Sequence, residues 1–225
     1  MDTASQQIKW HYETLPKETK QALDFFSKEK WLEENGWYLA GGTALALQCG
    51  NRTSYDLDFF TTEKSFDSKK LLINLIDNKD WLTDIASDGT VYGELFKAKI
   101  SFIAYPFFIP KENFIKHGIL KVARPIDIAV MKIIAVSQRG KKRDFFDLYW
   151  CVKNVASFKD IILRLKEQYP SVAHDYHHIL KSLVYFNDAE SDPDTIIFFD
   201  IKWSAVKKFF QTEIPKISKE IIKLS

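Results

Sequence analysis

The chain has 225 residues, of which 46% are hydrophobic and 28% are charged, and its formal net charge is +2 at pH 7. This composition excludes a disordered chain and fits an ordinary globular protein with one good core or two small ones. The small net charge argues neither for nor against a nucleic-acid partner, and any basic surface must be local.

Cysteine usage and the N-terminal residues indicate the compartment. Cys49 and Cys151 are the only cysteines and have no metal-ligand spacing, so we expect no structural disulfide and a reducing environment. The N-terminus lacks a basic start followed by an apolar run, and no apolar stretch approaches the length of a membrane span. We therefore expect a cytoplasmic protein without a membrane segment.

The first part of the chain predicts helix followed by a strand–turn–helix–strand unit. Residues 5–35 predict a helix that breaks at Leu15–Pro16 and packs as scaffold against a sheet. An apolar run then stops at a double glycine, Gly41–Gly42, and a short helix starts near Thr43. The following stretch predicts a second strand.

Two aspartates of that second strand form the first candidate site. Asp56 and Asp58 are two residues apart, so they share one face while Leu57 and Phe59 enter the core. Close carboxylates repel each other, and a hard divalent cation such as Mg²⁺ relieves the repulsion. The alternative interpretation is a turn followed by an edge strand with two solvated acids.

The preceding double glycine adds a phosphate site to this interpretation. Gly41 and Gly42 have no Cβ, so their N–H groups can approach a phosphate closely, and the helix starting near Thr43 adds its positive N-terminal end. A phosphate-binding turn and a pair of metal-binding carboxylates would then lie close together.

The next segments predict the rest of a sheet. Residues 66–81 predict a helix, residues 89–108 a hairpin or two neighbouring strands, and residues 111–125 a connector. A second metal ion beside the aspartate pair would call for a third carboxylate on a neighbouring strand. Ser101 stands where that acid would be expected, and Glu94 is the nearest acidic side chain. This departure weakens the case for two-metal chemistry.

A helix over residues 126–136 is apolar nearly all round and should be largely buried, yet Lys132 lies in its middle. This lysine must either extend its amine to water or meet an anionic partner, because burying it unpaired is costly. The functional interpretation is a cation presented to a nucleotide phosphate at the edge of the core.

A second helix begins after Gly140. On it, Asp144 and Asp147 share a face, and Arg143 can pair with Asp147 one turn on. Four basic residues beside the turn are placed to meet phosphates of a nucleotide or an RNA, or else form a solvated loop. They are Arg139, Lys141, Lys142 and Arg143.

The last third predicts helices over residues 157–168, 172–184 and 204–214, a strand-like run over 196–199, and a final amphipathic helix. His174, His177 and His178 are close enough on a helix to bind a metal, but no fourth ligand accompanies them. We interpret them as surface histidines.

These motifs resemble a known family. Residues 39–61 resemble the signature of the nucleotidyltransferase superfamily, in which a Gly-Gly turn precedes an Asp-x-Asp strand. More narrowly, Gly-Gly-Thr-Ala-Leu-Ala and Arg-x-Ser-x-Asp-Leu-Asp-Phe resemble the AbiEii/AbiGii toxins of bacterial abortive-infection and toxin–antitoxin systems. The lysine helix followed by Arg-Asp-x-x-Asp-Leu is similar to the same family, so the resemblance covers residues 37–150.

The resemblance implies an α+β fold with a mixed nucleotidyltransferase sheet near residues 37–108, a supporting N-terminal helix and a helical C-terminal half. We expect a core over residues 1–125 and a mainly helical region over 126–225 that completes the cleft.

The implied reaction transfers a nucleotidyl group from an NTP to an acceptor hydroxyl, which in this family includes a tRNA end, and an antitoxin usually accompanies such a toxin. The implied catalytic residues are Asp56 and Asp58 as Mg²⁺ ligands, Lys132 as a stabiliser of developing charge, and Asp147 to position or deprotonate the acceptor. The implied nucleotide-binding residues are Gly41, Gly42, Thr43, Arg52, Ser54, Arg143 and Asp144, of which Arg52 and Ser54 bind phosphate or brace the loop.

Two other functions stay open at this point. The first is a catalytically weakened nucleotide-binding or regulatory protein of the same fold, which the missing third carboxylate favours. The second is a structural interaction domain, which predicts no NTP binding and no effect from changing Asp58.

Overall fold

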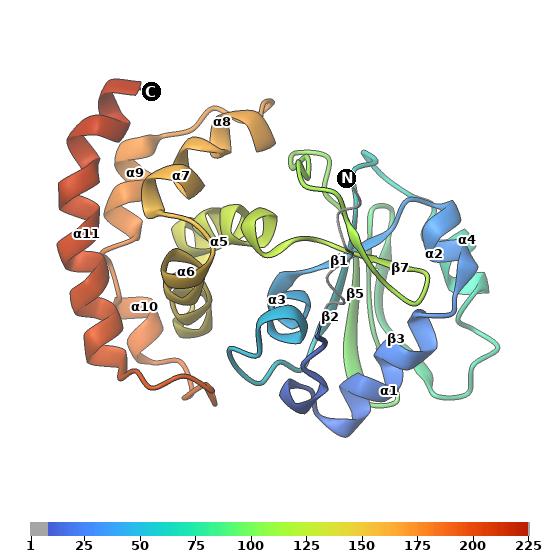
Figure 1. Cartoon of the computed structure of the whole chain (residues 1–225). Coiled ribbons are helices and arrows are strands. Elements are labelled where there is room, and N and C mark those ends of the chain that lie inside the picture. The colour runs from blue at the N-terminus through green and yellow to red at the C-terminus, as the bar shows by residue number, and fades with distance from the viewer. Residues whose placement is uncertain (1–8, 225) are drawn as a thin grey trace, which may run out of the picture.

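The computed structural model describes residues 9–224 as a mixed seven-stranded sheet with helices on both faces and a helical C-terminal half (Figure 1). The spatial order of the strands is β3-β4-β5-β2-β1-β7-β6. Their bounds are β1 Tyr38–Ala40, β2 Leu57–Thr61, β3 Trp81–Ser87, β4 Thr90–Leu95, β5 Ala98–Ala104, β6 Ile115–His117 and β7 Leu120–Val122. The predicted α+β class is confirmed.

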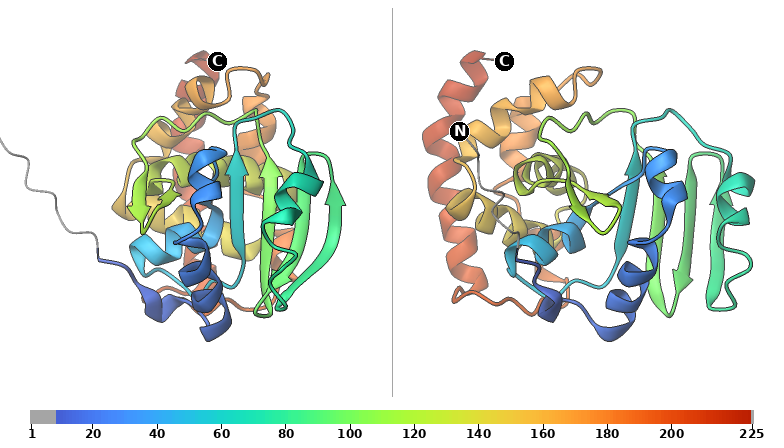
Figure 2. Two further views of the ribbon diagram at one scale, coloured as in Figure 1. Left: turned by 90° about the vertical axis from the view of Figure 1, so that its right-hand side faces the viewer. Right: turned by 45° about the vertical axis from the view of Figure 1, so that its right-hand side comes forward.

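The helices divide between the two faces of the sheet (Figure 2). On one side lie α1 Lys17–Phe26, α2 Lys30–Glu34 and α4 Ser68–Ile73. On the other side lie α3 Gly41–Cys49 and α5 Pro125–Arg139. Behind α5 stack α6 Lys142–Asn154, α7 Phe158–Leu163, α8 Leu165–Gln168, α9 Tyr176–Ser182, α10 Asn187–Glu190 and α11 Trp203–Leu224. No helix within this described range is long and apolar enough to cross a membrane.

The alternation of β2 separates the core from the site. Leu57 and Phe59 are fully buried on the face that α1 covers, where Phe59 packs 4.8 Å from Phe26 and 4.9 Å from Phe102 between ring centroids. Successive side chains of a strand point to opposite faces, so Asp58 and Phe60 face α5. The aromatic core thereby fixes the direction of Asp58. Asp56 was predicted on the same strand but precedes β2, which begins at Leu57.

Two predictions for the first half need correction. Residues 111–125 are more than a connector, because β6 and β7 form a hairpin there and β7 runs parallel to β1, so the sheet extends well past residue 108. The predicted helix over 66–81 is a helix only over Ser68–Ile73, since a turn over residues 74–80 contains polar, turn-forming side chains and Trp81 begins β3. The hairpin over 89–108 is confirmed as β4 and β5.

The terminal segments also differ from the predictions. Of the predicted helix over 5–35, residues 5–8 lie outside the described part, and the remainder is a 3-10 turn followed by α1 and α2. Residues 157–168 divide into α7 and α8, and residues 172–184 contain only α9. The strand-like run near 196–199 makes a single bridge, between Ile197 and Arg52. The last two predicted helices are one helix, α11.

Candidate active site

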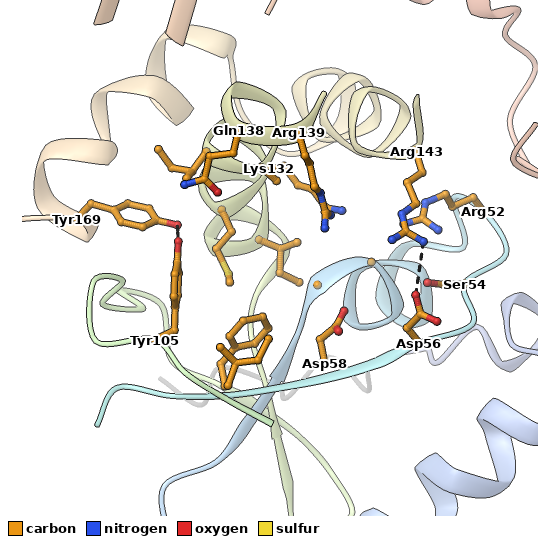
Figure 3. A pocket seen from close by; sticks show the side chains of 18 residues that line it. Arg52, Ser54, Asp56, Asp58, Tyr105, Lys132, Gln138, Arg139, Arg143 and Tyr169 are labelled. Carbon is orange, nitrogen blue, oxygen red and sulfur yellow. Dashed lines mark hydrogen bonds and ion pairs between the residues drawn. The ribbon is translucent and has the colours of Figure 1, made fainter. Parts of the chain in front are cut away.

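A cavity of about 260 Å³ lies between the sheet and α5 (Figure 3). The start of α3, the strands β2 and β5, and the helices α5 and α6 all contribute to its lining. Charged side chains gather at one end, around Asp56 and Arg143, and aromatic and amide side chains at the other, around Tyr105, Tyr169 and Gln138. The charged end contains most of the residues that the sequence singles out.

Both aspartates of the Asp-x-Asp pair line this cavity. Asp58 is partly buried, and burial is the largest cause of a pKa above the ordinary range, to which the neighbouring charge of Asp56 adds. Asp56 lies at the mouth, where its Oδ2 atom is 3.5 Å from Nη1 of Arg143. The structure therefore brings the two carboxylates together in a place where a cation would relieve their repulsion.

Ser101 occupies the position of the missing third acid. The register of β2 and β5 pairs Ser101 directly with Asp58, and the Ser101 hydroxyl donates a hydrogen bond of 2.7 Å to Asp58 Oδ1. This bond favours the ionised form of Asp58 and opposes part of the effect of burial. The strand that would supply a third carboxylate supplies a donor instead.

The double glycine makes room for two side chains of the site. Helix α3 begins at Gly41, whose φ is +72°, and a Cβ there would lie 2.6 Å from Asp58 Oδ2. A Cβ on Gly42 would lie 2.2 Å from a terminal nitrogen of Arg52. Glycine is thus required for Asp58 and Arg52 to lie against the N-terminus of α3, and both glycines line the cavity.

Buried hydrogen bonds hold the loop between α3 and β2. The Thr43 hydroxyl is buried, donates to the backbone oxygen of Asp56 and makes a hydrogen bond of 2.8 Å with the Ser54 hydroxyl. Ser54 and Arg52 line the cavity, whereas Thr43 does not. Thr43 therefore braces the loop that carries Asp56.

A buried ion network links this loop to the C-terminal helices. Arg52 donates to both carboxylate oxygens of Asp147, with Nε 2.7 Å from Oδ1 and a terminal nitrogen 2.8 Å from Oδ2. Lys132 Nζ lies 2.8 Å from Asp147 Oδ2 and 2.6 Å from Asp144 Oδ1. Arg139 binds Asp144 from the cavity side, at 2.9 Å from Nε to Oδ2.

The cations of this network decide the ionisation of its acids. Burial opposes the charge on Asp147, but Arg52 and Lys132 outweigh it and hold the pKa of Asp147 below its ordinary value. Burial likewise opposes the charge on Asp144, and Lys132 and Arg139 hold its pKa well below the usual range. Of the two environments expected for Lys132, the structure shows the anionic partners, while the lysine also lines the cavity.

One predicted pairing is wrong. Arg143 does not pair with Asp147, because Asp147 faces the buried side of α6 whereas Arg143 extends from its exposed side over the cavity mouth to Asp56. Lys141 and Lys142 are engaged by an acidic loop through Asp192 and Asp194. Of the basic group, only Arg139 and Arg143 line the cavity.

The aromatic end was not predicted. Tyr105 donates to the Tyr169 hydroxyl at 3.3 Å, and Gln138 lies beside them on α5. Tyr105 directly follows β5, so strand alternation offered a signal for it. Tyr169 follows α8 and lies 64 positions further along the chain, where no local pattern points to the cavity.

The three histidines do not form a metal site. His177 and His178 are exposed, and His174 is partly exposed, with its ring in contact with the rings of Tyr169 and Tyr176. Within residues 9–224, no group of three or more His, Cys, Asp or Glu side chains is arranged to hold a metal. A Mg²⁺ site needs fewer protein ligands, because one or two carboxylates together with waters and substrate phosphates suffice. Asp56 and Asp58 fit that donor set.

A sheet that carries Asp58 on a strand, with Asp56 just before that strand and a Gly-Gly helix start beside it, has the arrangement of a nucleotidyltransferase fold. The model of the nucleotidyl transferase AbiEii toxin family, of type IV toxin–antitoxin systems, matches residues 29–99 and 102–220. The chain therefore belongs to the AbiEii family.

The chain is also similar to one curated protein and to one solved structure. An uncharacterized protein of Aquifex aeolicus is 38% identical over 188 residues, which span 80% of this chain and 87% of the relative. The solved structure of MenT4, a nucleotidyltransferase toxin of Mycobacterium tuberculosis H37Rv, superimposes with a TM-score of 0.55 at 14% identity, covering 92% of this chain and 88% of that one. At this identity the structural match supports the fold alone.

Proposed function

We propose that the protein transfers a nucleotidyl group from an NTP to an acceptor hydroxyl and acts as the toxin of a toxin–antitoxin system. The observation that carries the proposal is one cavity in which two carboxylates, a glycine helix start and four cations meet. In the reaction, the acceptor oxygen bonds to the α-phosphorus, the bond to the β-phosphate oxygen breaks, and pyrophosphate leaves with that electron pair. The hydroxyl proton passes to water.

The cations and the helix start would bind the polyphosphate. Lys132, Arg139 and Arg143 face the cavity from α5 and α6, and the N–H groups at Gly41 and Gly42 offer the positive end of α3. Charge that develops on the leaving phosphates would be stabilised by groups already fixed in place. Ser54 and Arg52 would bind phosphate or hold the loop.

Asp56 and Asp58 would hold Mg²⁺. When bound, the ion polarises phosphoryl oxygens and neutralises developing charge. This chain's own contribution is to fix both carboxylates, through the Ser101 bond on Asp58 and the buried loop beneath Asp56.

Asp147 and Asp144 would act through other residues. Asp147 has no exposed surface, and its oxygens accept from Arg52, Lys132 and Asn51. We therefore propose that Asp147 orients Arg52 and Lys132 and does not contact the acceptor. Asp144 does the same for Lys132 and Arg139.

A second candidate function is a nucleotide-binding regulator that has lost turnover. The serine in the place of the third acid is the specific observation that favours it. It predicts NTP binding that depends on Asp58 without transfer.

The test is label transfer from each α-labelled NTP to total tRNA in the presence of Mg²⁺. Label on RNA that disappears with Asp58→Asn supports the transferase and identifies its nucleotide. Binding without transfer supports the regulator, and neither binding nor transfer contradicts both.

A further inference from the structure

In the proposed reaction the acceptor must reach the α-phosphate beside Asp56. A second hollow of about 620 Å³ shares Asp56 and Arg143 with the active-site cavity. Its other walls come from the start of α1, from Tyr55, and from the β4–β5 hairpin with Lys97 and Lys99. Asp56 and Arg143 therefore border both hollows.

The cations of this hollow are free for a ligand. Within residues 9–224, neither Lys97 nor Lys99 makes an ion pair or a side-chain hydrogen bond, and both are exposed. Arg143 is held only by the 3.5 Å contact with Asp56. Glu18 is the one other acid of the lining, so the wall carries an excess of positive charge.

The hairpin turn that carries Lys97 has an unusual backbone. Phe96 has φ +55° and Lys97 has φ +69°, the conformation of a two-residue turn that normally selects Asn and Gly. Phe96 packs on Phe25 of α1, which explains a ring at its position. The Lys97 side chain is exposed and lines the hollow, and an unfavourable backbone conformation at the edge of a site is a reason to look for a functional role.

Tyr55 adds an aromatic surface. Its side chain is 54% exposed and its ring contacts no other aromatic ring in the described part of the chain. Its backbone oxygen accepts a hydrogen bond of 2.7 Å from Thr19, so the residue is fixed while the ring is open. An exposed aromatic ring among cations is the combination that binds single-stranded nucleic acid by stacking and phosphate contacts.

We infer that this hollow, lined by Tyr55, Lys97, Lys99 and Arg143, binds the single-stranded 3′ end of an RNA acceptor and directs its terminal hydroxyl to the reaction beside Asp56. The inference rests on the proposed transfer reaction. A neighbouring hollow of about 420 Å³ near Lys141 is less suited to a polyanion, because Asp192 and Asp194 line it. The acceptor therefore approaches from the side of α1 and the hairpin, away from the tyrosine pair.

The test measures binding and transfer separately. Binding of a short fluorescein-labelled single-stranded RNA is followed by anisotropy without NTP, at several salt concentrations. The double variant Lys97→Gln/Lys99→Gln is compared with Lys208→Gln/Lys219→Gln, which removes the same charge from exposed positions of α11. Tyr55→Ala is compared with Tyr55→Phe, which keeps the ring.

The hairpin variant should bind RNA about tenfold more weakly at low salt, and its salt slope should fall by roughly 1.4, since each phosphate contact on a single strand contributes about 0.7. The α11 variant should bind like the wild type. Tyr55→Ala should weaken binding about fivefold or more, and Tyr55→Phe should restore it. The KM for RNA should rise in the hairpin variant while the KM for NTP stays constant.

Equal binding by the two double variants overturns the inference. Label transfer to a protein rather than to RNA also overturns the inference, and so does transfer by a wild type that does not bind the RNA probe. These two outcomes leave the proposed transfer reaction intact. RNA binding that depends on Lys97 and Lys99 without any transfer supports the surface and instead removes the proposed reaction.

Discussion

The buried network around Asp147 makes the sharpest prediction about stability. Asp147→Asn keeps the shape of the side chain but replaces one carboxylate oxygen by an NH₂ group that faces the donors of Arg52 or Lys132. The network then has three cations, Arg52, Lys132 and Arg139, and only one carboxylate, Asp144. Removing one partner of a buried ion pair costs about 3–5 kcal/mol, because the other charge stays buried without compensation.

A matched control separates burial from charge. Asp24→Asn removes the same charge from a salt bridge with Lys20, in which the two side chains are 43% and 46% exposed. An exposed pair of this kind contributes about 0.2–1 kcal/mol. Urea denaturation followed by circular dichroism gives both free energies of unfolding. Equal losses for the two variants would refute the reasoning.

The pH dependence of stability gives an independent readout. The pKa values of Asp147 and Asp144 are held below the ordinary value in the folded protein, so the stability they contribute is fully present above the unfolded pKa of about 3.9. It is lost as the pH falls through the lower folded values. The wild type should therefore lose stability below about pH 4, and Asp147→Asn should lose less over the same range.

The catalytic end supports three further predictions. Asp58→Asn should abolish transfer. Its free energy of unfolding at pH 7 should be unchanged or higher, because burial raises the pKa of Asp58 and makes the charged form unfavourable. Urea denaturation without divalent ions measures that free energy. Gly41→Ala should abolish transfer, because the added Cβ would lie against Asp58. Gly36 is the matched control, since it has the same φ of +72° and an added Cβ would have nothing within 4 Å. Gly36→Ala should lower the free energy of unfolding only by the backbone strain of about 1–2 kcal/mol. Ser101→Ala should raise the pKa of Asp58 further and move the acidic limb of the rate–pH profile to higher pH.

Local patterns predicted the elements that carry the site. A two-residue period on β2 is sufficient to place Asp58 on the cavity face, and a double glycine is sufficient to predict a tight turn into a helix. Asp56 also lines the cavity, although it precedes the strand. β6 and β7 were missed because each has three residues, too short for a periodic signal, and the pairing of β7 with β1 joins residues about eighty positions apart.

The partners of buried charges were harder to predict. The apolar neighbours of Lys132 showed that it needs water or an anion, but not which anion, since Asp144 and Asp147 lie on the next helix and reach it only through the packing of α5 on α6. The same packing turns Arg143 away from Asp147. Which face of α6 is buried depends on the whole C-terminal half, and spacing along one helix does not contain that information.

The network also bears on the expected division into residues 1–125 and 126–225, which stays a prediction. Arg52 belongs to the first part and Asp147 to the second, and each is buried against the other. Separating the two parts would leave a guanidinium in one and a carboxylate in the other without their partner, at a cost of several kcal/mol unless each became exposed to water. The cavity shares this dependence, because Asp58 comes from the sheet and Lys132, Arg139 and Arg143 come from the helices. We therefore expect the two parts to fold as one cooperative unit whose stability and active site depend on the same contact.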